Sequence, residues 1–464
     1  MSSDVYKPVS LVQINKKILY LALPMAATQF VSVASGFLCM MMLARLGHEV
    51  LAASALIFST QMSIMIITMS LLFSLSLLIG HAYGAKNYGA IGQWIQQGWT
   101  FAVVVSIPLM IGLWHIGPAL ILLGQNKNIA AIVQSFFYAH TLRVLPLMLG
   151  LCNQQLCYGV QKQHYDLIAN ILGIFVLLLT GYALILGKFG CPQLGVAGLG
   201  YAMAAQAWFY FLFTSICFCF DPSFKLYNLF SFRVHKGWQD LIKLLKVSWP
   251  ISLQISGEML SFFATSTIIG WLGVYDLAAY QVVLQYLLLI IIPIFALSQA
   301  SGILVGQARG AGKLNELKPL GYLSLAIAVT VSVITGLGFI LFPQHLTALY
   351  LNPHDPANAG IVRLLPSLFA VVALVLLCDA VRNTMTGALR GLFDTKFPMF
   401  IGLIMIWVVG LPLGYVLGFI LHFGVVGIAS GTAIGVFMGA VIVLYRWYVL
   451  SNKYSVKRIP KSAV

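Results

Sequence analysis

Two acidic side chains are candidates for chemistry because they lie in stretches that are otherwise apolar. Glu258 falls eight residues after Pro250 in a long apolar run, and Asp379 lies between Cys378 and Ala380 in another. An ionisable side chain at membrane depth costs at least about 2.5 kcal/mol, so it is rarely kept for packing. The other nine acids fall in tails, loops or the ends of apolar runs: Asp4, Glu49, Asp166, Asp221, Asp240, Asp276, Glu316, Asp355 and Asp394.

Each of the two acids has a polar neighbour at helical spacing. Gln254 lies one turn before Glu258, so both polar tips share a face that suits a wet cavity. Arg382 lies three residues after Asp379, which predicts an ion pair that holds Asp379 charged and could be purely structural. We therefore hypothesise that Glu258 exchanges protons while Asp379 stays ionised.

Two ions fit a pair of buried carboxyl groups. Desolvation favours the neutral form of a carboxylic acid, which makes proton binding near pH 7 feasible. Two carboxylates with neighbouring amide and hydroxyl oxygens could instead hold sodium, a hard cation suited to oxygen ligands. The residues leave both alternatives open. We expect no other metal site, because the sequence has no C-x-x-C pair or His/Cys ligand spacing.

The remaining polar residues within apolar runs have weaker patterns. Gln281 and Gln285 share a helix face and are candidates for lining the same cavity, with ordinary hydrogen bonding between helices as an equal alternative. His140 and Arg143 could contact an anionic substrate, but snorkelling or bonding between helices is the favoured interpretation. Cys39 and Cys378 are expected to pack as small apolar residues.

The composition indicates that these residues sit on membrane-spanning helices. Hydrophobic residues make up 60% of the chain and charged residues only 8%, against about 25% charged in a soluble domain. A membrane span needs about 20 apolar residues, and we expect twelve, of which the first is too long for a cleavable signal. The expected spans are 18–43, 53–80, 99–123, 132–157, 167–187, 196–219, 247–271, 278–305, 319–342, 361–389, 398–420 and 425–448.

The net charge of +15 alternates with the spans. With the N-terminus inside, 20 of the 26 lysines and arginines fall in the tails and in loops on the same side, against three (Arg45, Lys127 and Lys188) in the opposite loops. This is the positive-inside bias, which places both termini in the cytoplasm. A nucleic-acid surface would have no reason to alternate in this way, so we expect no nucleic-acid partner.

An internal repeat divides the chain into two lobes. Pro24 and Pro250 occupy equivalent positions, as do the segments 80–85 and 306–311, and each pair is 226 residues apart (250 minus 24). Six spans separate the copies, so the repeats run parallel about an axis along the membrane normal, an arrangement known in transporters. We expect an N-terminal lobe of residues 1–225 and a C-terminal lobe of 226–464, joined by a cytoplasmic connector at about 221–246.

Nearly the whole chain resembles the multidrug and toxic compound extrusion (MATE) transporters, with details most similar to the NorM-type branch. The resemblance rests on buried Glu258 after Pro250 and on three motifs: Leu-Ala-Ala-Tyr-Gln-Val at 277–282, Gly-Gln-Ala-Arg-Gly at 306–310 and Ala-Leu-Arg-Gly-Leu-Phe-Asp-Thr-Lys at 388–396. It implies a V-shaped bundle of two six-helix lobes that exports organic cations or other amphiphiles by alternating access, driven by protons or sodium. Glu258 and Asp379 match the acids that line the C-lobe cavity.

The N-terminal half departs from that family. Many relatives carry an aspartate in span one within a Gly-Phe-x-Asp arrangement, where this chain reads Gly-Phe-Leu-Cys at 36–39. Leu177 and Gly181 stand where span five commonly carries asparagines. A mechanism that depends on an N-lobe carboxylate therefore cannot be transferred.

These observations together predict a monomeric transporter of the inner cell membrane that needs no cofactor and takes small cationic amphiphiles. The alternative is a flippase for lipid-linked precursors, which would hold pyrophosphate with basic cavity residues, for which only Arg143, Arg363 and Arg382 are candidates. A membrane-embedded enzyme is disfavoured because the sequence has no HExxH and no acidic metal cluster. Two lobes without ring symmetry also offer no obvious channel filter.

Overall fold

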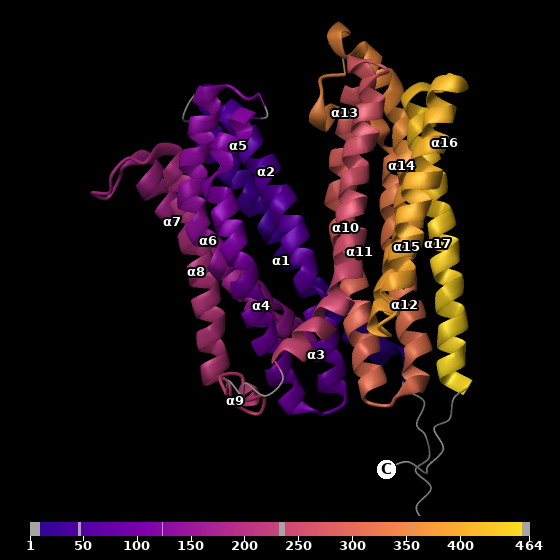
Figure 1. Cartoon of the computed structure of the whole chain (residues 1–464). Coiled ribbons are helices and arrows are strands. Elements are labelled where there is room, and N and C mark those ends of the chain that lie inside the picture. Colours follow the sequence, from indigo (N-terminus) through magenta and orange to yellow (C-terminus); the bar gives the residue numbers. More distant parts are fainter. Residues whose placement is uncertain (1–9, 45–47, 123, 232–236, 354, 457–464) are drawn as a thin grey trace, which may run out of the picture. The chain divides into compact units, whose positions relative to one another are not determined.

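The computed structural model describes residues 10–44, 48–122, 124–231, 237–353 and 355–456, and within these ranges every regular element is a helix (Figure 1). Several basic residues used to orient the chain lie outside the described residues. These are Lys7, Arg45, Arg233, Lys236, Lys457, Arg458 and Lys461.

The described chain forms two compact units. Residues 24–249 form the N-terminal unit, and residues 250–464 together with 1–23 form the C-terminal unit. The chain passes from one unit to the other at Pro24 within helix α1 (Leu11–Ala44) and at Pro250 within helix α10 (Gly237–Gly270). Proline lacks a backbone N–H, so each position interrupts the hydrogen bonding of its helix. The lobe boundary expected at 225/226 is drawn from the repeat and stays a prediction.

The N-terminal unit contains α1 from Pro24 onward, α10 up to Trp249 and eight complete helices between them. They are α2 (His48–Leu72), α3 (Ser74–Gly84), α4 (Tyr88–Trp114), α5 (Ile116–Leu122), α6 (Lys127–Gly159), α7 (Gln163–Leu186), α8 (Gly195–Phe220) and α9 (Pro222–Lys225). Helix α6 packs against α2, α4 and α8, which makes it the central helix of this unit. Cys39 is fully buried among apolar side chains here, in agreement with the packing role expected for it.

The C-terminal unit contains α10 from Pro250 onward and the rest of the chain. Its further elements are α11 (Val274–Gly310), α12 (Leu314–Leu341), α13 (Pro343–Tyr350), η1 (Pro356–Asn358), α14 (Ala359–Gly391), α15 (Lys396–Ile404), η2 (Met405–Gly410), α16 (Leu411–Tyr415), η3 (Val416–Ile420) and α17 (Gly424–Val456). Helix α14 packs against α11, α12 and α17 and is therefore the central helix of this unit.

Most expected spans correspond to single helices, and ten helices in the described part of the chain are long and apolar enough to cross a membrane. The expected second span is divided between α2 and α3 at Phe73. The expected seventh span begins ten residues early, because α10 continues into the polar connector and includes Asp240 and Lys243. A search for apolar residues finds the membrane-embedded part of a helix, whereas the helix itself extends into water.

Close packing of α11 and α14 fixes the part of α14 that carries the acid. A Cβ added at Gly387 would lie 2.0 Å from the Ser298 carbonyl oxygen, so only glycine permits this approach. The Ser298 hydroxyl donates to the carbonyl oxygen of Asn383 at 2.6 Å. Asn383 lies one turn from Asp379, so the contact holds this turn of α14 against α11.

The expected eleventh span is a helix with two wide turns. It runs from α15 to η3, and both η2 and η3 are π-helical segments. Such segments are often found at functional positions in helices. The first one carries Trp407, whose indole N–H donates to the Gly257 carbonyl oxygen at 3.1 Å. This bond ties α10 to the eleventh span beside Glu258.

Asp221 caps helix α9 at the start of the connector and binds several neighbouring side chains. It pairs with Lys162 at 2.9 Å and accepts hydrogen bonds from Ser223 and Tyr165. Burial alone would raise the pKa of Asp221, but the hydrogen bonds from Ser223 and then Lys162 hold it below its ordinary value. The carboxylate therefore stays ionised and joins the α6–α7 loop to the end of α8.

Candidate functional site

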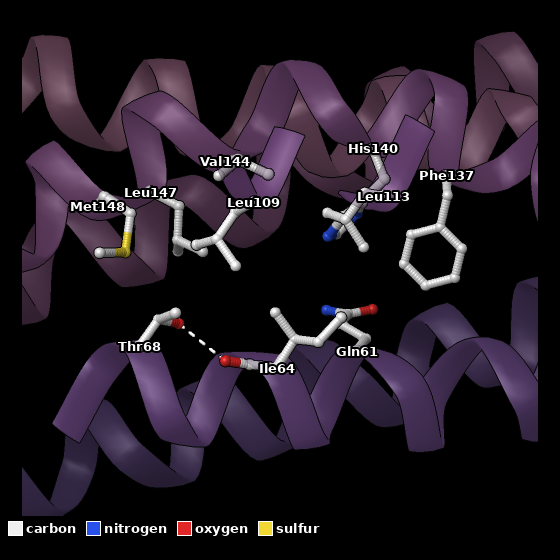
Figure 2. A pocket seen from close by; sticks show the side chains of 10 residues that line it. All are labelled: Gln61, Ile64, Thr68, Leu109, Leu113, Phe137, His140, Val144, Leu147 and Met148. Atoms are coloured by element: carbon white, nitrogen blue, oxygen red, sulfur yellow. Dashed lines mark hydrogen bonds between the residues drawn. The ribbon is translucent and has the colours of Figure 1, made fainter. Parts of the chain in front are cut away.

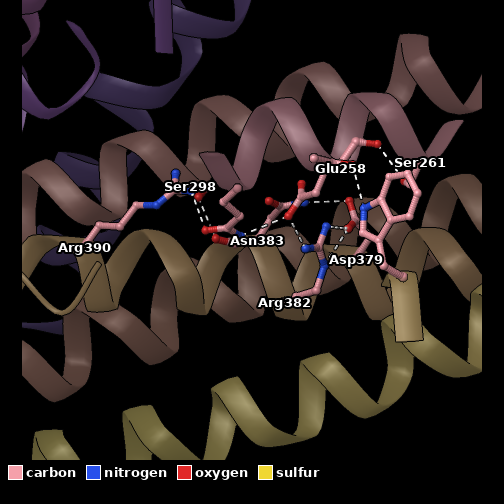
Figure 3. A network of polar contacts seen from close by, with 10 residues as sticks. Glu258, Ser261, Ser298, Asp379, Arg382, Asn383 and Arg390 are labelled. Carbon is pink, nitrogen blue, oxygen red and sulfur yellow. Dashed lines mark hydrogen bonds and ion pairs between the residues drawn. The ribbon is translucent and has the colours of Figure 1, made fainter. Parts of the chain in front are cut away.

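A chain of ion pairs connects the two candidate acids within the C-terminal unit (Figure 3). Arg382 on α14 donates through Nη1 to Glu258 Oε1 on α10 at 2.5 Å, and through Nη2 to Asp379 Oδ1 at 2.6 Å. The Arg382–Asp379 pair is the one that the three-residue spacing predicts, and the structure confirms it. The pair with Glu258 joins two helices that are far apart in the sequence.

A second arginine extends the network through an amide. Gln254 Nε2 donates to Glu258 Oε1 at 3.0 Å, which confirms that the two side chains share a face of α10. The carbonyl oxygen of the same amide accepts from Arg390 Nη2 at 2.9 Å. The site therefore contains two acids and two arginines, so its formal charge is zero when both acids are ionised.

The second oxygen of Asp379 is also occupied. Asn383 Nδ2 donates to Asp379 Oδ2 at 2.7 Å, while Arg382 Nε and Nη2 both donate to Oδ1. Asp379 thus receives hydrogen bonds on both oxygens from its own helix. A carboxylate solvated in this way is stabilised in its charged form by local partners.

Glu258 is less completely enclosed than its partners. Its side chain is 14% exposed, against 6% for both Asp379 and Arg382. Every hydrogen bond that the described residues donate to the carboxylate of Glu258 falls on Oε1, from Gln254 and Arg382. The second oxygen is thus the part of the network that is open to an incoming ion or to water.

The backbone of α15 closes one side of the network at a glycine. A Cβ added at Gly402 would lie 3.2 Å from Gln254 Nε2, 3.4 Å from Glu258 Oε1 and 3.5 Å from Arg382 Nη1. The first distance is tighter than most contacts of a Cβ atom and the other two are ordinary van der Waals contacts, so an added Cβ would press on the Gln254 amide and touch the other two polar groups. Glycine at this position lets the eleventh span lie directly against them.

The structure brings four of the six predicted site residues together. Glu258, Asp379, Gln254 and Arg382 form the network, whereas Gln281 Nε2 donates to Ser266 Oγ at 3.3 Å and Gln285 is exposed. Both glutamines lie on α11, away from the contacts described above.

Sequence reasoning missed several members of the network. Arg390 was expected in a cytoplasmic loop, but α14 continues to Gly391 and keeps the guanidinium partly buried. Asn383 is found one turn after Asp379, a spacing that could have suggested it. Trp407 carried no signal, because its contact depends on how the eleventh span packs.

The N-terminal unit also holds a buried acid that the sequence placed at a span end. Asp166 lies in the first turn of α7 and is fully buried. Its carboxylate accepts hydrogen bonds from Tyr158, Tyr210, Gln154 and Asn170 at 2.6 to 3.1 Å. These donors come from α6, α7 and α8, so Asp166 ties three helices together. With four donors and no cation on it, this carboxylate has the partners of a structural residue.

No group of three or more His, Cys, Asp or Glu side chains comes together among the described residues in a way that could hold a metal ion. At the Glu258–Asp379 site the guanidinium of Arg382 lies between the two carboxylates and occupies an oxygen of each. A sodium ion shared by these two acids would have to displace the arginine.

Comparison with known proteins places the chain among transporters. The MatE family model matches residues 24–183 and 250–416, once in each half and beginning at the two equivalent prolines. The chain is 31% identical to the probable multidrug resistance protein NorM of Brucella suis biovar 1 (87% of this chain, 86% of the relative) and 30% identical to that of Synechocystis (93% and 94%).

The fold is also that of solved transporters. The structure superposes on the Vibrio cholerae MATE transporter VcmN in the bent form with a TM-score of 0.85, at 16% identity, covering 96% of this chain and all of that one. The all-α membrane fold expected from the sequence, with twelve spans in two lobes, is therefore confirmed.

Proposed function

This chain belongs to the MatE family of multidrug efflux transporters, and from that premise we propose that it exports amphiphilic compounds in exchange for protons that visit Glu258. Its relatives are transporters rather than enzymes, and they are named for multidrug resistance, which favours drug export over the flipping of lipid-linked precursors. The observation that carries the proposal is the position of Arg382 between Glu258 and Asp379.

The arrangement favours the proton over sodium as the coupling ion. Sodium binding between two carboxylates needs several oxygen ligands around the ion, and here an arginine already takes one oxygen of each acid. A proton needs only one free oxygen, and Glu258 has one that no described residue contacts by a hydrogen bond. We therefore assign proton exchange to Glu258, and to Asp379 the ion pair that keeps Arg382 in place.

Protonation of Glu258 would change the partners of Arg382. With a neutral Glu258, the guanidinium keeps its contacts to Asp379 while its attraction to α10 weakens. Helix α10 also carries Pro250 and passes from one unit to the other, so a changed contact at Glu258 acts on the helix in which the two units meet along the chain. This is how occupancy of one carboxyl group could bias alternating access.

The substrates proposed here are amphiphiles that carry a delocalised positive charge. Deprotonated Glu258 offers an anionic oxygen for such a group, and exchange with protons then follows because the two cations compete for one carboxylate. We further propose that the chain acts as a monomer in the cytoplasmic membrane, with both termini in the cytoplasm. The excess of basic residues in the loops on that side supports this orientation.

Dye uptake into proteoliposomes tests the proposal. Rhodamine 123, a flat fluorescent cation, would be offered under a proton gradient or a sodium gradient of equal size. We expect uptake with the proton gradient only, and none with Glu258→Gln. Glu316→Gln is the matched control, since Glu316 pairs with Lys313 at the start of α12 away from the network. Uptake driven by sodium alone, or by neither gradient, would refute proton-coupled export.

A further inference from the structure

A partly buried cation of the N-terminal unit, Arg143, has no ion-pair partner among the residues that the structure describes. Arg143 is on α6, and its Nε and Nη1 are shielded from solvent and have no hydrogen-bond partner. No ion pair joins it to an acid among the described residues of this unit. The acids of this unit whose side chains the structure describes have other partners: Asp166 has its four donors, Asp221 pairs with Lys162 and Asp240 pairs with Lys243.

Snorkelling does not explain Arg143. It lies eleven residues from the nearer end of the expected span 132–157, which is about 16 Å at about 1.5 Å per residue. An arginine side chain is far too short to reach the headgroups from there. Hydrogen bonding to a neighbouring helix, the other expected role, is not found for Nε or Nη1.

A small pocket next to this turn of α6 is lined by two further unpaired polar atoms, although Arg143 itself is not among its lining residues. His140, one turn earlier on α6, is 3% exposed and its Nδ1 has no partner. It lines a pocket together with Gln61 of α2, whose Oε1 is also unpaired, and Figure 2 shows the two side chains facing the same space. The other lining residues are Ile64, Thr68, Leu109, Leu113, Phe137, Val144, Leu147 and Met148.

Position 39 leaves the charge uncompensated. Cys39 of α1 is fully buried and is close enough to Arg143 for an electrostatic interaction, as is His140. A cysteine thiol is neutral at physiological pH unless its surroundings favour the thiolate. The positive charge on α6 therefore has a neutral neighbour on α1.

We propose that Arg143 and His140 form a subsite for an anionic group of the transported substrate, a carboxylate or a group of similar shape. The guanidinium fork matches a carboxylate with two parallel hydrogen bonds, and such a ligand would give partners to the shielded Nε and Nη1 of Arg143. The substrate class then includes zwitterionic amphiphiles, which carry a delocalised cation and a carboxylate. This substrate assignment rests on the proposed export function, whereas the anion subsite itself can be tested by binding alone.

The test uses two dyes that differ in one group. Rhodamine 110 has a free carboxylate, and rhodamine 123 is its methyl ester. Binding of each to the purified full-length protein in detergent would be measured by fluorescence anisotropy for the parent and for Arg143→Gln. We expect Arg143→Gln to weaken binding of rhodamine 110 by about tenfold or more, the effect of losing a charge-assisted hydrogen bond, and to leave rhodamine 123 nearly unchanged.

Substitution of Cys39 gives a second test that keeps the arginine in place. Cys39→Asp supplies an internal carboxylate that competes with the ligand, so it should reproduce the selective loss, while the neutral Cys39→Asn should bind both dyes like the parent. Equal losses for both dyes, or unchanged binding of rhodamine 110 in Arg143→Gln and Cys39→Asp, would overturn the subsite. If the parent binds rhodamine 110 selectively but transports neither dye, the export function fails and the subsite stands.

Discussion

Arg382 contacts both acids of the C-terminal unit, so the charge of one acid affects the arginine's contact with the other. Asp379 holds the guanidinium from within α14 and is itself held by Asn383, while Glu258 contacts the guanidinium from α10. A buried arginine held by two carboxylates is costly to expose and costly to remove. The residue is therefore expected to support both the packing of the unit and proton exchange.

Arg382→Gln should destabilise the protein strongly, because it leaves two carboxylates in a largely buried site without their cation. Removing one partner of a buried ion pair costs about 3–5 kcal/mol. Thermal unfolding followed by tryptophan fluorescence in detergent would show the loss. Arg446→Gln is the control: Arg446 also pairs with an acid, Asp394, but its side chain is 38% exposed, and such pairs contribute only about 0–1 kcal/mol. Equal shifts in the two variants would contradict the role of Arg382.

Contacts within one helix could be predicted from the sequence, whereas contacts between helices could not. Gln254 with Glu258, and Asp379 with Arg382, follow from helical spacing alone. The Glu258–Arg382 pair depends on how α10 packs against α14, which no local pattern encodes. The unpaired state of Arg143 was equally hidden, because it depends on where the acids of the other helices lie.

Among the helices, α15 has the most direct influence on the site because its backbone covers the network at Gly402. Gly402→Ala adds a methyl group 3.2 to 3.5 Å from atoms of Gln254, Glu258 and Arg382. We expect a several-fold loss of dye transport with little change in stability, since the new group presses on the Gln254 amide that donates to Glu258 and not on the core. Uptake into proteoliposomes and thermal unfolding, measured together, would separate the two effects.

Gly338→Ala is the control for that substitution. Gly338 lies in α12, and a Cβ added there would meet no atom within 4 Å. Alanine has the higher helix propensity, so this variant should transport normally and be at least as stable as the parent. Loss of transport in Gly338→Ala as well would indicate that glycine matters for helix flexibility rather than for space.

In the N-terminal unit, side chains of helices α6, α7 and α8 all donate hydrogen bonds to the carboxylate of Asp166. Asp166→Ala leaves two tyrosine hydroxyls and two amides without their acceptor, each at about 1–3 kcal/mol if it stays buried. We expect a loss of about 3 kcal/mol or more in thermal unfolding experiments, with the coupling ion of the surviving protein unchanged. A stable variant that no longer couples to protons would instead assign Asp166 to transport.

Helix existence could be predicted from the sequence, but helix ends could not. Apolar runs marked the membrane-embedded parts, while α10 and α14 both continue into polar residues. The tenth span was expected to end at residue 389, so Arg390 was assigned to a loop and was not predicted to belong to the Glu258–Asp379 site. Asp166 was discounted in the same way, because a residue at a span end can still be buried when neighbouring helices cover it.

In the whole molecule, the chain is strongly basic, yet the two acids of the network within the C-terminal unit are balanced by an equal number of arginines. The net charge of +15 comes from tails and loops, whereas Glu258 and Asp379 lie among two arginines. The MatE model matches each half, yet the two halves have diverged: one keeps two acids in a polar network, and the other has an unpaired arginine beside Cys39. This asymmetry favours a transporter that exchanges protons in one unit and selects substrate charge in the other.

Proton release on substrate binding tests proton exchange at Glu258 most directly. Rhodamine 123 would be added to the purified protein in weakly buffered detergent solution containing a pH-sensitive dye, with binding followed in parallel by anisotropy. The parent is predicted to release protons as the dye binds, and Glu258→Gln to release none even at saturating dye. Equal proton release by the parent and by Glu258→Gln at equal occupancy would contradict the assignment of the exchanged proton to Glu258.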